Sequence, residues 1–430
     1  MNATTSAALI LAVMVAAYVA AKAFKVSTEL ALFAAALAGA AAGGNGLPAR
    51  HIVEGAFTYF DIVLIFVTAT LFMNLLKESG AAVFVVRAIL RRFHRHKAPL
   101  FVLLALLLLV PGALTGAGSV TVLIMGGMAA TVLGTMDVPP PKAAAIIFVI
   151  AGLSAAAPPV NLWAMLTAAG VNMPYVGFFL PLLVPCVVLA LLTIFILGRK
   201  AKPVDLAKAL AELPAAPPRM NWLRVATPFL VFLLLVVAGR VFPFDVPILG
   251  LPLMFAAAAA AALALSPVKV AFFRTSLETV RQLLPLIGTL TCAGILVQIM
   301  ALTGVRGLIA ITTVTLPVTV VFLTLFVTLP VSEAVLMWGA APVLGVPLVL
   351  LFNTIGLDPV VALAGMSVIW PLGDAIPPTA IIGRLTTATV GMKEPYGKFL
   401  RYCLVPGILV AIVGTLMVVF SKSLAFLTVF

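Results

Sequence analysis

Apolar stretches about as long as a membrane-spanning helix follow one another along most of this chain, separated only by short polar gaps. A helix needs about 20 predominantly apolar residues to cross a bilayer. Charged residues make up 9% of the 430, whereas soluble domains carry about 25%. The pattern excludes a water-soluble globule and predicts an all-α polytopic membrane protein.

Twelve apolar segments are candidates for spans or re-entrant segments, and four of them are broken by proline or glycine. The first resembles a signal peptide in length, but no positive charge precedes it and Lys22 and Lys25 follow it, so we expect a retained span. The candidates cover residues 6–22, 27–43, 59–76, 99–134 (broken), 143–168 (broken), 176–197, 225–241, 248–266, 283–301, 307–350 (broken), 360–389 (broken) and 402–420.

Basic residues outnumber acidic ones, 26 to 13, which gives a formal net charge of +13. Such an excess suggests nucleic acid when a chain presents a basic face. Here the basic residues fall in the short gaps between apolar stretches, so we expect no nucleic-acid partner. Positive charge collects in the cytoplasmic loops of membrane proteins. We therefore interpret the charge as a topology signal and expect a multi-pass protein of the cell inner membrane.

Nothing in the sequence points to catalysis. The three cysteines lie inside apolar stretches, and none of the three histidines has the cysteine or carboxylate company of a metal site. The patterns G-x-x-x-x-G-K-[ST], G-x-S-x-G and H-E-x-x-H are absent. We expect a protein that is not an enzyme and has no cofactor, with bound Na⁺ as the one open question.

The chain carries an internal duplication. Its longest polar interval, 199–224, contains six basic and two acidic residues and separates two halves that resemble each other. Three collinear matches at offsets of 224, 219 and 221 make chance similarity a poor explanation. We predict a first repeat at 1–198, a cytoplasmic linker at 199–224 and a second repeat at 225–430. The matching segments are 66–82 with 290–306, 155–161 with 374–380, and 174–190 with 395–411.

The charges indicate that the two repeats are inverted. Segment 87–97 has five Lys or Arg, whereas its partner 311–321 has none. The reverse holds later, because 172–180 has none and 392–401 has three. If basic loops stay in the cytoplasm, equivalent loops lie on opposite sides of the membrane. Inverted repeats with discontinuous helices are typical of secondary transporters, which bind substrate near the bilayer midplane.

Four segments break the helical pattern at membrane depth. A Pro-Pro pair removes two backbone donors and frees carbonyls, which is tolerated in a bilayer only inside protein or beside a wet cavity. A single break is more often a packing kink, but four in symmetric positions, each with small polar residues, favour a binding site. The breaks are Pro111–Ser119, Ala155–Asn161, Leu329–Ala334 and Gly373–Ala380.

Oxygen atoms at these breaks suit sodium, and the half-helix N-termini suit an anion. The predicted substrate-binding residues are Thr115, Gly116, Ser119, Asn161, Ser332, Thr379 and Arg384. The predicted Na⁺ or H⁺ coupling residues are Ser119, Pro158, Glu333, Asp374 and Pro377.

Two carboxylates inside apolar segments need an explanation, because ionisable groups at membrane depth are expensive. Glu333 and Asp374 each lie at a break in the second half. They either carry protons or bind sodium, or else they satisfy nearby backbone donors or a basic neighbour. Arg384 either pairs with a substrate carboxylate or extends to the cytoplasmic interface. The cluster of arginines at 91–95 either sets orientation alone or also binds anionic lipid.

The order of these features resembles a known family. A G-x-x-[ST]-G-x-x-S break at 112–119, a first Pro-Pro break, a basic linker and a second Pro-Pro break follow one another as in the large permease subunit of TRAP transporters and, more broadly, the ion transporter superfamily. The stretch 74–96, NLLKESGAAVFVVRAILRRFHRH, is also similar to a helix and amphipathic arm of that subunit. The resemblance covers nearly the whole chain.

The resemblance implies an elevator-type transporter, in which two re-entrant hairpins and two broken helices move against a scaffold. It places hairpin tips at Thr115–Ser119 and Ser332–Glu333, and broken-helix sites at Ala157–Asn161 and Ile376–Thr379. It also implies a small membrane subunit and an extracytoplasmic binding protein as partners, in addition to membrane lipid.

The sequence thus predicts a symporter that imports a small organic anion, such as a dicarboxylate or sugar acid, with sodium or protons. A passive anion channel is one alternative, and it requires a continuous polar pore. A non-catalytic membrane subunit of a larger assembly is another. A membrane enzyme acting on lipid-linked substrates is disfavoured, because the outer loops are short and nearly uncharged.

Overall fold

The computed structural model describes residues 2–242, 244, 247 and 249–429, and every regular element in them is a helix. Nine helices in this part of the chain are long and apolar enough to cross a membrane. The prediction of an all-α, multi-pass membrane protein is therefore confirmed. Ile248, the first residue of one predicted span, lies outside the described residues.

Seven helices form a scaffold to which each half of the chain contributes. Helix α2 of the first half packs on α15 of the second, and α14 of the second packs on α4 of the first. This reciprocal packing is what two related repeats produce around a pseudo-twofold axis. The scaffold helices are α1 (Ala3–Ala23), α2 (Thr28–Ala42), α3 (Ala49–Phe57), α4 (Phe60–Glu78), α13 (Trp222–Val241), α14 (Leu251–Ala264) and α15 (Phe272–Leu302).

One arm helix in each half leads from the scaffold to a re-entrant hairpin. The arms are α5 (Ala81–Phe93) and α16 (Val305–Thr315). Hairpin 1 consists of α6 (Lys97–Thr115), α7 (Gly118–Thr121), η1 (Val122–Gly126) and α8 (Gly127–Thr135). Hairpin 2 consists of α17 (Val318–Leu336), η2 (Met337–Gly339), η3 (Ala341–Gly345) and α18 (Val346–Thr354).

A broken helix follows each hairpin, and an unbroken helix follows each broken one. The first is α9 (Pro140–Ala156) with α10 (Leu162–Gly170), and the second is α19 (Pro359–Ile369) with η4 (Trp370–Ala375) and α20 (Ile381–Val390). The unbroken helices are α11 (Phe179–Leu197) and α21 (Tyr396–Val419), and η5 (Ala425–Val429) follows α21. The hairpins, the broken helices, α11 and α21 are called the transport domain below.

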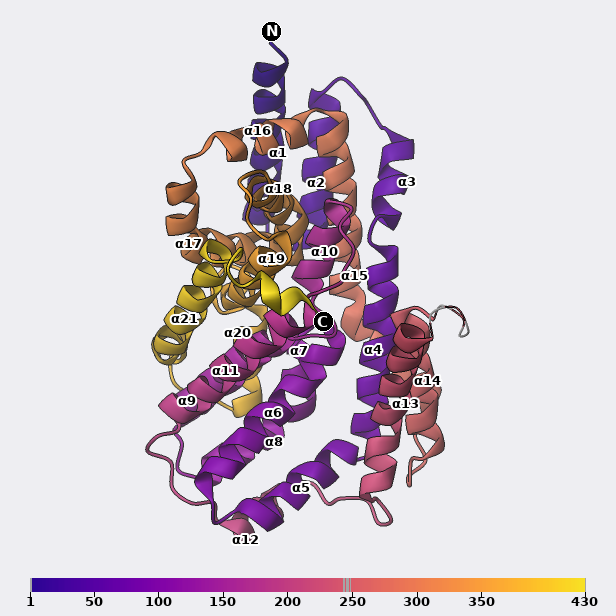
Figure 1. The fold of residues 1–430 in the computed structure, drawn as a ribbon, viewed down its shortest axis with the longest axis vertical. Helices are drawn as coiled ribbons and strands as arrows, with labels where there is room; N and C mark the ends of the chain where they lie inside the picture. The colour runs from indigo at the N-terminus through magenta and orange to yellow at the C-terminus, as the bar shows by residue number, and fades with distance from the viewer. Residues whose placement is uncertain (1, 243, 245–246, 248, 430) are drawn as a thin grey trace.

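The repeats correspond element by element and are inverted. The π-helical turns 122–126 and 341–345 are 219 positions apart, and Gly80 and Gly304 start the two arms with positive φ at an offset of 224. Helix α10 packs on η3 and α18, and its equivalent α20 packs on η1 and α8, so each broken helix contacts the other repeat's hairpin. The equivalent arms α5 and α16 lie at opposite ends of the long axis (Figure 1).

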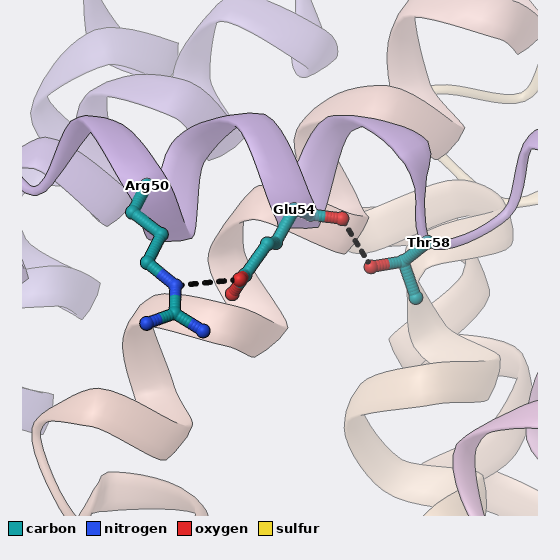
Figure 2. Close-up of polar contacts among 3 residues, drawn as sticks. All are labelled: Arg50, Glu54 and Thr58. Carbon is teal, nitrogen blue, oxygen red and sulfur yellow. Dashed lines mark hydrogen bonds and ion pairs between the residues drawn. The ribbon is translucent and has the colours of Figure 1, made fainter.

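Two segments expected as loops are helical, which corrects the predicted spans. Residues 44–58 contain α3, and residues 267–282 contain the first turns of α15. Both segments are too polar for an apolar window to detect. Helix α3 keeps Arg50 Nε 2.8 Å from Glu54 Oε1 on its exposed side, as Figure 2 shows. Its other side packs closely on α15, where Gly55 meets the backbone of Ile295.

The basic linker folds against the end of the molecule that carries α5. The Arg87 guanidinium donates to the carbonyls of Leu210, Leu213 and Pro214, at 3.0, 3.1 and 3.0 Å. These carbonyls lie in the last turn of the short helix α12 (Leu206–Glu212) and just after it. Figure 1 places α5 and α12 together at the lower end of the molecule. The linker is thus a docked segment, held by the same basic arm that the charge pattern assigns to the cytoplasm.

Candidate functional site

Hairpin 1 turns at Gly116, as the sequence predicts, but most residues at its tip are buried and packed against neighbouring residues. Gly116 has φ +65°, and a Cβ there would lie 2.8 Å from the Phe66 ring and 3.1 Å from Val160. The fully buried Thr115 hydroxyl donates to the carbonyl of Pro111 in its own helix at 2.7 Å. Ser119, just beyond the tip, is half-buried. Of the three predicted substrate contacts at this tip, Ser119 has the most open surroundings.

Asn161 holds the first break together from inside. Its side chain is fully buried, its Oδ1 accepts from the Ala164 amide at 2.8 Å, and its Nδ2 donates to the Ala156 carbonyl at 2.7 Å. The side chain therefore caps α10 and bridges back to the end of α9. Pro158 is buried in the same break. Both groups that Asn161 would offer to a substrate are already used, which argues for a structural role instead.

The tip of hairpin 2 lies beyond the position predicted from the sequence. Ser332 and Glu333, predicted at the tip, belong to the last turns of α17, and the chain reverses at Met337, which has φ +55°. The error has a simple cause, because Pro330 is tolerated inside α17, just as Pro111 is inside α6. The helix continues past Pro330 and ends at Leu336, because Met337 adopts a positive φ.

Among the predicted residues, Glu333 lies at a contact between the two repeats. It is fully buried, and its Oε2 accepts a hydrogen bond from the indole Nε1 of Trp163 at 2.9 Å. Its other oxygen, Oε1, has no hydrogen-bond partner among the described residues. Trp163 lies on α10, so this contact joins the first broken helix to hairpin 2.

Asp374 comes from the second break and lies beside Glu333. Its neighbour Gly373 packs so tightly on α17 that a Cβ there would lie 2.7 Å from the Cβ of Glu333 and would collide with the Pro330 carbonyl. Asp374 is 3% exposed, and its Oδ2 also has no hydrogen-bond partner among the described residues. Two buried carboxyl groups, each with an oxygen that has no hydrogen-bond partner among the described residues, therefore lie where α10, hairpin 2 and the second break meet. We call Glu333 and Asp374 the acid pair.

The hydroxyls around the acid pair tie hairpin 2 to the second break. Ser332 Oγ accepts from the Trp370 indole at 3.3 Å, and Thr379 Oγ1 donates to the Ala334 carbonyl at 2.9 Å. Four predicted residues are thus brought together around α17. They are Ser332, Glu333, Asp374 and Thr379.

The second break is exposed at its Pro-Pro pair, whereas the first break is buried. Pro377 is exposed, in contrast to the buried Pro158 at the equivalent position. Arg384 is also exposed, and the one hydrogen bond of its side chain within the described residues is a 3.5 Å contact with the Pro378 carbonyl. Its remaining donors are available to an anion. Thr115, Gly116 and Asn161 belong instead to the closed first-half side.

The described residues contain no group of three or more His, Cys, Asp or Glu able to hold a metal ion. Two unpaired buried carboxylates are costly unless a proton or a cation compensates their charge. A Na⁺ ion or a proton between Glu333 and Asp374 would do so, and backbone carbonyls at the breaks are further oxygen ligands.

Two contacts across the domains escape sequence analysis. Tyr18 on α1 donates through its hydroxyl to the Val335 carbonyl at the tip of hairpin 2, at 2.5 Å. Arg306 on α16 donates through Nη2 to the Gly170 carbonyl at the end of α10, at 2.7 Å. Both side chains look like interface residues in the sequence. No local pattern indicates that their partners are main-chain carbonyls far along the chain.

Comparison with known proteins supports a transporter fold. No protein-family model matches the sequence, and no curated protein matches it significantly. The YdaH transporter of Alcanivorax borkumensis superposes with a TM-score of 0.60 at 16% identity, over 86% of this chain and 87% of that one. MtrF of Neisseria gonorrhoeae, described within a class of antimetabolite efflux pumps, gives a TM-score of 0.58 at 13% identity, over 87% and 85%.

At these identities the likeness concerns the fold. The chain has the architecture of solved membrane transporters, with re-entrant hairpins and broken helices in two inverted repeats. Neither of these two neighbours is a TRAP permease. The resemblance to that family therefore stays a prediction.

Proposed function

We propose that this protein is a secondary active transporter that imports a small organic anion, such as a dicarboxylate or sugar acid, in symport with sodium ions or protons. The observation that carries the proposal is the acid pair, Glu333 and Asp374, at the junction of both repeats. Binding of a cation or proton there would relieve the unpaired charge, and its release would restore that charge. A site of this kind links ion binding to the arrangement of the surrounding helices.

The anion is proposed to bind at the second break, close to the acid pair. Arg384 and Pro377 are exposed there, and Thr379 is partly buried between them and α17. A guanidinium matches the planar, bidentate geometry of a carboxylate. The Asp374 side of the break would hold the coupling ion, and the Arg384 side would hold the substrate.

The transport domain would carry both across the bilayer by an elevator movement against the scaffold. Its helices make broad contacts with one another, and the hairpins and arms provide the contacts with α1, α4 and α15 that such a movement would break and remake. The proposed location is the cell inner membrane, with the basic linker in the cytoplasm. A small membrane subunit and an extracytoplasmic binding protein are the partners that the TRAP resemblance adds to this proposal.

Uptake into proteoliposomes tests the proposal. Purified protein is reconstituted, and uptake of labelled dicarboxylates and sugar acids is measured with an inward Na⁺ gradient, with an inward proton gradient and with neither. We expect concentrative, saturable uptake of one of these anions with one of the gradients. Uptake of none of the anions with either gradient would contradict the proposal.

The same vesicles separate the alternatives. Counterflow exchange, in which unlabelled internal anion accelerates entry of labelled anion, is expected of a carrier and excludes a passive channel. A non-catalytic subunit would show transport only after co-reconstitution with proteins that co-purify with it. The name of MtrF refers to efflux, so labelled anion is also loaded inside the vesicles. Gradient-driven exit without gradient-driven entry would reverse the proposed direction.

A further inference from the structure

Two clefts between the arms and the transport domain are equivalent under the inverted repeat, but they differ in size. The cleft beside α20 has a volume of about 440 Å³ and is lined by Ala82 of α5, Gly127 of α8 and Thr389 of α20, among others. The repeat offsets of 224 and 219 map these three residues onto Arg306, Val346 and Gly170. Arg306 and Val346 line a cleft of only about 10 Å³.

Arg306 closes the smaller cleft with one hydrogen bond. Its Nη2 lies 2.7 Å from the carbonyl of Gly170, the last residue of α10. Carbonyls at a helix C-terminus lack helical partners and carry partial negative charge, so a guanidinium is well suited to bind there. The side chain of Val346 packs directly against Gly170 behind this contact. The arm α16, hairpin 2 and α10 therefore form one closed interface.

Ala82 occupies the equivalent place in the larger cleft and has no donor to offer. The cleft stays open between α5 and α20, and Lys77 and Glu78 at the end of α4 both line it. Residues Leu213 and Pro214 of the linker also line it, so this cleft lies on the linker side of the molecule. Polar atoms make up a large part of its wall, in contrast to the apolar cavities elsewhere in the fold.

The burial of the broken helices shows the same asymmetry. In α10, all residues from Leu162 to Ala168 are buried. In the equivalent α20 only Ile382, Gly383 and Thr386 are buried. Helix α10 packs mainly on η3, α18 and α19 of the transport domain and also contacts the scaffold helix α4, whereas the main contacts of α20 are with α7, α8, α9, η1 and η4 of the transport domain. One broken helix is enclosed along most of its length, and the other faces an open cleft.

We infer that the cleft lined by Lys77, Gly127 and Thr389 is the path by which substrate passes between the second break and the linker side, and that the Arg306–Gly170 contact is the gate that closes the equivalent path on the opposite side. This inference rests on the proposed transport function. Alternating access in an inverted repeat exchanges the conformations of the two halves. In the opposite state, Arg306 leaves the Gly170 carbonyl and the cleft beside α20 closes.

Thiol labelling at two equivalent positions tests the inference. Gly127→Cys and Val346→Cys are placed separately in a full-length chain whose three native cysteines, Cys186, Cys292 and Cys403, are replaced by alanine. Gly127 is exposed, and the atom nearest to a Cβ there is 3.9 Å away, so the cysteine fits. Val346 is 2% exposed. A membrane-impermeant maleimide is added to vesicles from the linker side or from the opposite side.

We expect Gly127→Cys to react from the linker side and Val346→Cys to be protected from both sides. Arg306→Ala removes the gate contact, and loss of one charge-assisted hydrogen bond shifts a two-state equilibrium by about tenfold or more. Val346→Cys then reacts about tenfold faster from the opposite side, and Gly127→Cys reacts more slowly. Arg306→Lys keeps a donor and restores protection, and Arg240→Ala, at an exposed arginine of α13, leaves both rates unchanged.

Equal labelling of the two cysteines in the parent chain would overturn the inference, and this comparison does not depend on how Arg306→Ala folds. Unchanged rates in a folded Arg306→Ala protein, judged by its thermal unfolding, would overturn it as well. The labelling needs no substrate. Protection as expected without uptake would therefore count against the proposed function alone, and uptake without the expected protection would count against the gate alone.

Discussion

At the scale of single residues, the acid pair explains why two of only 13 acidic side chains lie buried at membrane depth. The sequence points to Glu333 and Asp374 because each is an ionisable residue at a break inside an apolar segment. The sequence did not indicate that they are neighbours, since 41 positions separate them and the contact depends on the way the second break folds onto α17. The partner of Glu333, Trp163, lies in the other repeat.

Trp163→Phe removes the one side-chain hydrogen-bond donor that Glu333 has within the described residues, while keeping an aromatic ring. A buried carboxylate oxygen without its donor costs about 1–3 kcal/mol, so we expect lower thermal stability and a changed dependence of transport on the coupling ion. The unfolding temperature and the apparent affinity for Na⁺ or H⁺ check this. Trp222→Phe is the control, because Trp222 is 56% exposed. If Trp163→Phe and Trp222→Phe have the same apparent ion affinity, the Trp163 indole contributes to packing and not to ion binding.

Gly373→Ala tests the close approach that places Asp374 beside Glu333. The added methyl would meet the Pro330 carbonyl and the Glu333 side chain, and overpacking of this kind costs about 1–3 kcal/mol. We expect a lower unfolding temperature and loss of transport. Gly134→Ala is the matched control, since nothing lies within 4 Å of its Cβ position. Normal transport by Gly373→Ala would show that the contact is dispensable.

At the scale of elements, the two breaks differ in structure, although each contains a Pro-Pro pair at an equivalent position. The first is closed by Asn161, which uses both ends of its amide within the chain. At the equivalent position of the second break, Ala380 offers no side-chain partner, and the Pro377 side is exposed. The sequence predicted both breaks at their observed positions, but it assigned Asn161 to the substrate, because an amide that caps a helix and one that binds a ligand look alike in a sequence.

Asn161→Ala should loosen α10 relative to α9. Loss of a helix cap costs about 1 kcal/mol, and the unpaired Ala156 carbonyl adds to this. Asn221, an exposed cap of α13 with the same Oδ1 contact to an amide, is the control. We expect thermal unfolding of Asn161→Ala at a clearly lower temperature than that of Asn221→Ala. A larger change in substrate affinity than in stability would instead favour the original assignment of Asn161 to the substrate.

Hairpin 2 is fastened to the scaffold through the Tyr18 hydroxyl and the Val335 carbonyl. Tyr18→Phe removes a hydrogen bond worth about 0.5–1.5 kcal/mol and keeps the ring. We expect faster proteolysis or thiol labelling near Met337, with little change in overall stability. Tyr402→Phe serves for comparison, because the Tyr402 hydroxyl makes no hydrogen bond in the part of the chain that the structure describes. Equal labelling of both variants would show that hairpin 2 does not depend on this contact.

At the scale of the whole molecule, the sequence predicted the fold well and the site only in part. Apolar length, internal matches and charge asymmetry are properties that a linear pattern records, and they led to the all-helical inverted architecture. They failed where helices are polar, at α3 and the start of α15, and where a proline continues a helix, at Pro330. The acid pair and the Arg306 gate join segments from both repeats, so only the folded chain brings their members together.

If the acid pair couples an ion gradient to anion transport, the coupling depends on the charge of Glu333 and Asp374. The most direct measurement is concentrative uptake into proteoliposomes by the parent, Glu333→Gln and Asp374→Asn, each compared with substrate counterflow in the absence of a gradient. Both variants keep the shape of the side chain and remove its charge. We expect gradient-driven accumulation to be lost while counterflow is retained. Accumulation at the parental level in both variants would contradict it.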